Sequence, residues 1–177
     1  MSLPFTPFHY PIAYLMYKLD RRLPLPALVI SAMVPDLEIP VLVLIGWIHD
    51  RMVLHSIIGG ILVGVPLTMV LLGVYQWLIP RIFSVNAERL ASKCKVTKWS
   101  VWAASIGVLS HVLFDATHHE YNPLLWPITI DSINTLMPVD IYLAIPMVYA
   151  VMGGLSLIIA VYVYSRYDNF FEETLVG

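Results

Sequence analysis

The sequence has few charged residues. Asp, Glu, Lys and Arg together make up 12% of its 177 residues, where a soluble domain usually has about a quarter. Hydrophobic residues make up 59%, and the mean hydropathy is +0.78. Such a chain is expected to turn most of its surface toward lipid. We therefore predict a single integral-membrane domain over residues 1–177, with no separate soluble domain.

Other features that the sequence lacks exclude further classes of protein. The single cysteine, Cys94, excludes an intramolecular disulfide. The net charge of −2 provides no field that would attract nucleic acid. The first residues, MSLPFTPFHYP, lack the basic stretch and apolar run of a cleavable signal peptide, so none is expected.

Long apolar runs predict an all-α membrane bundle of about five helical segments. A transmembrane helix needs roughly 20 mostly apolar residues, and two runs meet this length without a formal charge. The remaining runs are shorter or carry acids near the middle. In chain order, the predicted segments are Pro4–Leu19, Ala27–Ile48, Ile57–Ile79, Trp99–Phe114 and Ile141–Ser165.

The basic residues predict an orientation in the plasma membrane. Nine of the ten follow the first segment, fill the loop between the third and fourth, or follow the last: Lys18, Arg21, Arg22, Arg81, Arg89, Lys93, Lys95, Lys98 and Arg166. Only Arg51 falls on the other side. Because cytoplasmic loops are rich in Lys and Arg, we predict that the N-terminus is outside and the C-terminus inside. This requires Pro4–Leu19 to cross or deeply enter the membrane, although a re-entrant or surface-lying helix is the alternative.

Two acids interrupt the second segment. An ionised side chain at the bilayer centre costs about 2.5–3.5 kcal/mol on insertion scales, so Asp36 and Glu38 need a partner or a bound cation. Pro35 and Pro40 flank them in VPDLEIP, which predicts a broken helix lining a polar cavity. Both acids serve one centre only if the break distorts the backbone; otherwise one binds and the other supports it from behind.

A second polar group ends the fourth segment, in GVLSHVLFDATHHEYNP over residues 107–123. His111 and Asp115 are spaced i, i+4 and share a helix face, and His118 and His119 continue that stripe if the helix persists. Imidazole and carboxylate are the ligands that zinc prefers and that manganese or iron accept. We predict a metal centre here.

The predicted topology brings distant residues to this centre. His9, Asp36, His55, His111 and Asp115 all fall on the extracytoplasmic side. Simpler interpretations stay open as well: His111 and Asp115 as a hydrogen-bonded pair, His55 as a helix start, Arg51 as an anchor to lipid phosphate, and residues 118–120 as a solvated loop. His49 and Asp50 are interpreted as ordinary turn residues.

Several stretches taken together resemble a family of bacterial and archaeal membrane-bound metal-dependent hydrolases. They are TPFHYPIAYL, LPALVISAMVPDLEIP, DRMVLHSIIGG and LSHVLFDATHH followed by LLWP, in order over about residues 4–127. The family has an early histidine, a Pro-Asp-x-Asp/Glu turn, a His-Ser helix start and a later His-x-x-x-Asp motif. The resemblance implies a metal-dependent hydrolase.

A more distant resemblance is to zinc-dependent phospholipase C and the zinc single-strand nucleases. Their ligands follow the same order, so this resemblance implies that His9, Asp36, His55, His111 and Asp115 bind metal, with Asp115 as a bridge. Those enzymes also use an N-terminal tryptophan and a second downstream motif. Only His118, His119 and Glu120 stand near the place of that motif, so one or two ions, rather than three, are expected.

The sequence thus predicts a hydrolase that cleaves a phosphoester, of a lipid headgroup, through water activated by one or two Zn²⁺ ions, with Mn²⁺ or Fe²⁺ as alternatives. Glu38 or Glu120 is the predicted general base, and Arg51 is predicted to hold a phosphate oxygen. Three alternatives stay open: a cation or proton transporter using the same acids and histidines, a non-catalytic scaffold with or without a structural metal, and a haem protein.

Overall fold

The computed structural model describes residues 6–133, 136 and 139–177, and within them all regular structure is helical. The 3-10 helices are η1 (Thr6–His9) and η2 (Val34–Leu37), and η3 (Gly60–Gly64) is a π-helix. The α-helices are α1 (Tyr10–Leu19), α2 (Leu25–Ser31), α3 (Glu38–Leu44), α4 (Ile57–Gly59), α5 (Val65–Ile82), α6 (Ala87–Lys93), α7 (Lys98–Asp115), α8 (Ile141–Arg166) and α9 (Phe170–Leu175).

Two helices are long and apolar enough to cross a membrane, or three if a bent pair forms one span. They are Ile57–Ile82, which joins α4, η3 and α5, and α8; the bent pair is α2 with Val34–Leu44. The predicted first segment, Pro4–Leu19, contains η1 and α1, and its residues 4 and 5 lie outside the described part of the chain. Its α-helix, α1, has 10 residues and rises only about 15 Å. The fourth predicted segment is the helix α7, but α7 is not among the helices that are both long enough and apolar enough to cross a membrane. The structure therefore supports two or three spans rather than clearly five.

The break at VPDLEIP is confirmed. α2 ends at Ser31, the 3-10 turn η2 carries Asp36, and α3 starts at Glu38. The two helical parts are bent by 43°. A 3-10 turn with Pro35 near its start interrupts the α-helical hydrogen bonding here.

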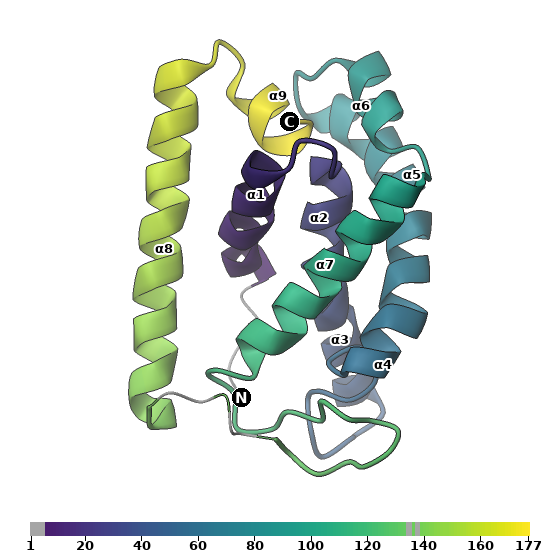
Figure 1. Ribbon diagram of the computed structural model, residues 1–177, viewed down its shortest axis with the longest axis vertical. Coiled ribbons are helices and arrows are strands. Elements are labelled where there is room, and N and C mark those ends of the chain that lie inside the picture. The colour runs from purple at the N-terminus through teal and green to yellow at the C-terminus, as the bar shows by residue number, and fades with distance from the viewer. Residues whose placement is uncertain (1–5, 134–135, 137–138) are drawn as a thin grey trace.

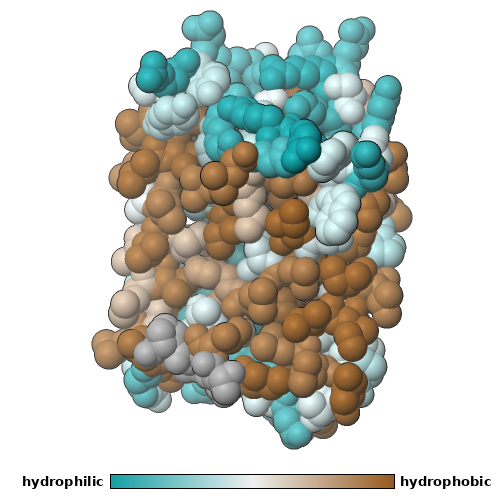
Figure 2. Space-filling model, in the orientation of Figure 1, coloured by the Kyte–Doolittle hydropathy of each residue, from teal (hydrophilic) through white to brown (hydrophobic). Residues whose placement is uncertain are grey.

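The basic residues and the predicted site lie at opposite ends of the bundle. In Figure 1, the ends of α1 and α8, the start of α7, and the short helices α6 and α9 lie at the top, whereas α3, α4 and the end of α7 lie at the bottom. Of the nine basic residues of the predicted inner side, eight belong to these top elements or to the turns beside them, and Arg81 lies in the last turn of α5, which leads into α6. Figure 2 shows a broad hydrophobic belt between a hydrophilic top and a smaller hydrophilic bottom.

The middle of the bundle is held by α2 and α7. Gly107 of α7 lies so close to α2 that a Cβ atom there would stand 1.8 Å from the Ser31 hydroxyl and 2.9 Å from the Leu28 carbonyl oxygen. α7 starts with a capping box between Thr97 and Ser100. These contacts fix the height and rotation of α7 and therefore the position of His111 and Asp115.

Candidate metal centre

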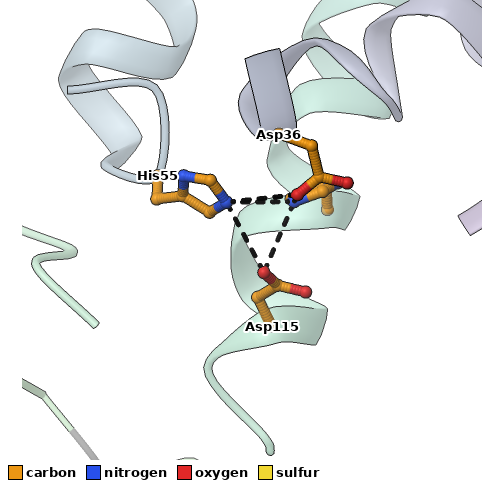
Figure 3. A group of neighbouring side chains, drawn as sticks. Asp36, His55 and Asp115 are labelled. Carbon is orange, nitrogen blue, oxygen red and sulfur yellow. Dashed lines mark hydrogen bonds and ion pairs between the residues drawn. The ribbon is translucent and has the colours of Figure 1, made fainter. Parts of the chain in front are cut away.

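Four buried side chains from three parts of the chain meet at the lower end of α7. Asp36 comes from η2, His55 precedes α4, and His111 and Asp115 belong to α7. One ligand atom of each lies within 4.8 Å of the others. Figure 3 shows Asp36, His55 and Asp115 pointing toward one another. The predicted convergence of these residues is confirmed.

The ligand atoms of the four side chains lie close together. His111 Nε2 lies 3.3 Å from His55 Nε2, 3.5 Å from Asp36 Oδ1 and 3.4 Å from Asp115 Oδ2. His55 Nε2 lies 3.6 Å from each of the same two oxygens. Because these five distances are short and no pair of the four atoms is more than 4.8 Å apart, the four atoms are close enough to surround one metal ion.

The tautomers of both histidines are fixed by acceptors behind them. His55 Nδ1 lies 2.7 Å from Glu38 Oε1, and His111 Nδ1 lies 2.7 Å from the Ala32 carbonyl oxygen. Because both acceptors require a proton on Nδ1, each neutral imidazole presents an unprotonated Nε2 to the centre. Two nitrogen lone pairs and two carboxylates then face one another, and this repulsion is relieved by a central cation or by protonation of the imidazoles.

Glu38 lies behind His55 rather than in the centre. Its carboxylate accepts hydrogen bonds from the backbone N–H groups of Met52 (2.7 Å), Leu54 (2.8 Å) and His55 (3.2 Å), in addition to the His55 ring. These bonds fasten the segment before α4 to the start of α3. The structure thus places Glu38 as the supporting acid, and its role as a general base stays a prediction.

A second group of ligand atoms shares Asp115. His118 Nε2 lies 3.9 Å from Asp115 Oδ1, and His119 Nε2 lies 3.8 Å from Oδ2. The group meets the same 4.8 Å limit. Burial lowers the pKa of His118, and it lowers the pKa of His119 to about 3. Both rings are therefore neutral at physiological pH, the form that binds metal.

His9 completes the surroundings of Asp115. Its Nε2 lies 3.4 Å from Asp115 Oδ1, and its ring stacks on His111 with 3.8 Å between centroids. The His9 Nδ1 atom is buried without a hydrogen-bond partner. His9 therefore lies beside the shared carboxylate but belongs to neither group of converging ligand atoms, so its role as a metal ligand stays a prediction.

Arg51 is buried against the same carboxylate. Its Nε lies 3.3 Å from Asp115 Oδ2, its Nη1 lies 2.9 Å from Asp50 Oδ1, and its Nη2 lies 3.0 Å from His119 Nε2. Asp50, interpreted from sequence as a turn residue, is thus an ion-pair partner of a site residue.

Two adjoining cavities reach this centre. A small one of about 20 Å³ is lined by residues that include His9, Asp36 and Asp115. A larger one of about 410 Å³ lies between the end of α3 and the start of α8. Arg51, His118 and His119 line both cavities. A space of ligand size therefore lies next to the metal centre, across the side chains of Arg51, His118 and His119.

Glu120 and His49 lie on the large cavity, away from the four ligand atoms. Both side chains are exposed, and His49 stacks on Tyr121 with 3.7 Å between ring centroids. Sequence reasoning missed the supporting carbonyl of Ala32, for which a backbone acceptor leaves no signal. It also missed Trp47, Tyr121 and Ile145 on the cavity wall.

The fold and this centre define a helical protein with two or three helices apolar enough to span a membrane and a buried His/Asp cluster able to hold a metal ion. A family described as a domain of unknown function (DUF4184) matches residues 3–175, so the chain belongs to that family. The searches of curated proteins and of solved structures found no match.

Proposed function

We propose that this protein is a membrane-embedded metal-dependent hydrolase that cleaves phosphoester bonds. The observation that supports it best is the set of four converging ligand atoms, with both histidine tautomers set by Glu38 and Ala32. Asp36, His55, His111 and Asp115 would hold a Zn²⁺ ion, and Mn²⁺ or Fe²⁺ suits the same donors. Asp115, His118 and His119 would hold a second ion, with Asp115 bridging the two.

A bound ion of this kind lowers the pKa of water to about 7 and polarises a phosphoryl oxygen. The residues of the chain do the rest. The planar guanidinium of Arg51 is oriented by Asp50 and Asp115 and lines both cavities, where it would hold a phosphate oxygen. Of the two predicted general bases, Glu120 lines the large cavity and has the better access to substrate.

The proposal includes an orientation. Nine of ten basic residues lie at the end of the bundle away from the centre. By the positive-inside rule, that end faces the cytoplasm, which puts the site on the extracytoplasmic side of the plasma membrane, the N-terminus outside and the C-terminus inside.

The test is hydrolysis in detergent solution. The purified protein should cleave bis(4-nitrophenyl) phosphate, lose this activity on chelation and regain it with Zn²⁺. The Asp36→Ala variant should be inactive, whereas the His49→Ala variant, with its ring on the rim, should retain activity. A metal-loaded protein that cleaves no phosphoester would refute the proposal.

A transporter is the second candidate, favoured by the acids on the bent pair of helices. Between the two ends, however, the side chains of α2 that face the bundle are apolar apart from Ser31. Sealed vesicles separate the two functions: a transporter moves protons or cations across them, and a hydrolase works in detergent without any compartment.

A further inference from the structure

The side chains of α8 that face the rest of the bundle have different neighbours in the two halves of the helix. Met152, Ile159 and Val163 are buried in the bundle. Ile141 and Ile145 continue the same 3.6-residue stripe toward the site end, but they line the large cavity, and Val148 lines the small one. An apolar helix face that packs on protein in one half therefore borders a cavity in the other.

The opposite wall of the cavity is also apolar. Val43, Trp47 and Ile48, at and just beyond the end of α3, are exposed and line it. α8 is a candidate span, and α3 belongs to the bent pair that forms the third. A cavity with apolar walls between two spanning segments lies beside hydrocarbon, so a lipid chain suits it better than a water-soluble molecule does.

The inner end of the cavity is polar. Arg51, His118 and His119 line this end and also line the small cavity at Asp36 and Asp115. The carboxylates of Asp50 and Glu120 line the large cavity as well, and Asp50 is paired with Arg51. Arg51 is the one Lys or Arg among the described residues on its wall, so a single anionic group is best placed beside Arg51, next to the metal centre.

We infer that the substrate is a phosphate-bearing membrane lipid that reaches the centre sideways, from the bilayer, between α3 and α8. One acyl chain lies against Ile141, Ile145 and Trp47, and the phosphate lies at Arg51. This inference rests on the proposed hydrolase function, but it adds the substrate class, the route and the residues that select the substrate.

Filling the cavity tests the route. An Ile145→Trp substitution places a large ring in the acyl site, whereas Met147→Trp places the same ring two residues away on the exposed face of α8. The substrates are phosphatidylglycerol in mixed micelles and the soluble diester bis(4-nitrophenyl) phosphate. For Ile145→Trp we expect kcat/KM to fall about tenfold or more for the lipid and to fall much less for the soluble diester, with unchanged metal content. Met147→Trp should match the wild type on both.

Equal losses on both substrates in Ile145→Trp, or no loss on the lipid, would overturn the inference. A second measurement does not depend on activity. Phosphatidylglycerol with a diazirine on one acyl chain, in phosphatidylcholine vesicles, should crosslink to residues 43–48 and 141–148. The crosslink at these residues should be weakened by Ile145→Trp and not by Met147→Trp.

The two proposals can fail separately. Cavity crosslinking by a protein that cleaves no phosphoester would leave the lipid site standing and remove the hydrolase. If the protein cleaves the soluble diester but shows no crosslink that Ile145→Trp weakens, the hydrolase function stands and the lipid site is refuted.

Discussion

The two ends of the bundle both bury acidic side chains, but they compensate the charge differently. At the end with the basic residues, the Glu173 carboxylate pairs with Lys18, lies 3.8 Å from Arg21 and accepts a hydrogen bond of 3.1 Å from Tyr14. Lys18 also donates to the Tyr167 hydroxyl at 3.0 Å. Each group there has a partner of opposite charge or polarity.

At the site end, positive charge is in deficit. Asp36, Glu38 and Asp115 are buried, and the permanent cation among the described residues around them is Arg51, which also serves Asp50. The remaining neighbours are histidines whose Nε2 atoms point at the carboxylates. A structural ion pair is complete without a ligand, whereas this arrangement is balanced only by a bound cation or by protonation of the imidazoles. The comparison therefore separates a stabilising polar cluster from a binding site.

The largest effect should follow removal of the shared carboxylate. Asp115→Ala should lower phosphoester hydrolysis roughly 1000-fold or more, because several kcal/mol of metal-dependent stabilisation is lost. Asp50→Ala removes an acid that contacts Arg51 but none of the ligand atoms, so its loss of activity should be much smaller. Equal effects of the two substitutions, measured by initial rates, would contradict the role of Asp115.

The second-largest effect should follow a change of Glu38, whose carboxylate holds the His55 ring. Glu38→Gln should weaken metal binding about 10- to 100-fold, as for other acids that orient a histidine ligand, measured by competition with a chelating dye. Glu120→Gln, on the cavity rim, should leave the affinity unchanged. If Glu38→Gln instead keeps its affinity and loses hydrolysis together with the acidic limb of the pH profile, Glu38 is the general base.

At the end of the bundle with the basic residues, a substitution should change the stability of the protein but not its metal content. Glu173→Gln should lower the free energy of unfolding by about 2–3 kcal/mol, because it weakens charged hydrogen bonds to Lys18 and leaves that ammonium poorly compensated. Metal content should not change. Thermal unfolding in detergent measures the effect, with the exposed Glu88→Gln as control. Loss of metal in Glu173→Gln would show that the two ends are not independent.

The smallest predicted effect tests the packing that positions α7. Gly107→Ala should destabilise the protein by about 1–2 kcal/mol, because the added methyl meets Ser31 and the Leu28 backbone. Gly154→Ala has open space around it and should be neutral or slightly stabilising. The same unfolding experiment compares them, and equal stability of the two variants would contradict the close contact.

The candidate site was more predictable from sequence than the span count. Histidines and acids are rare in this chain, so the spacing of His111 and Asp115 and the isolated Asp36 stood out against apolar surroundings. Once the direction of each segment was predicted, these residues fell at one end. The number of spans depends instead on where tertiary packing starts and ends each helix. For example, α1 begins only at Tyr10, after the 3-10 helix η1.

The cavity wall was beyond sequence reasoning for a physical reason. In α8, inward and lipid-facing residues are both apolar, so hydrophobic periodicity gives no direction for Ile145. For Asp36 and Glu38 the sequence left two alternatives, and the structure shows the second of them: Asp36 enters the centre, while Glu38 accepts hydrogen bonds from the backbone before α4 and lies behind His55.

Elemental analysis of protein purified without chelators is the most direct test of the metal centre. We predict at least one transition-metal ion per chain in the wild type, and little or none after His111→Ala, with the metal content of His49→Ala unchanged. A folded wild-type protein that carries no metal and takes up none on dialysis against Zn²⁺, Mn²⁺ or Fe²⁺ would contradict the account, since the four converging side chains would then be compensated by protons alone.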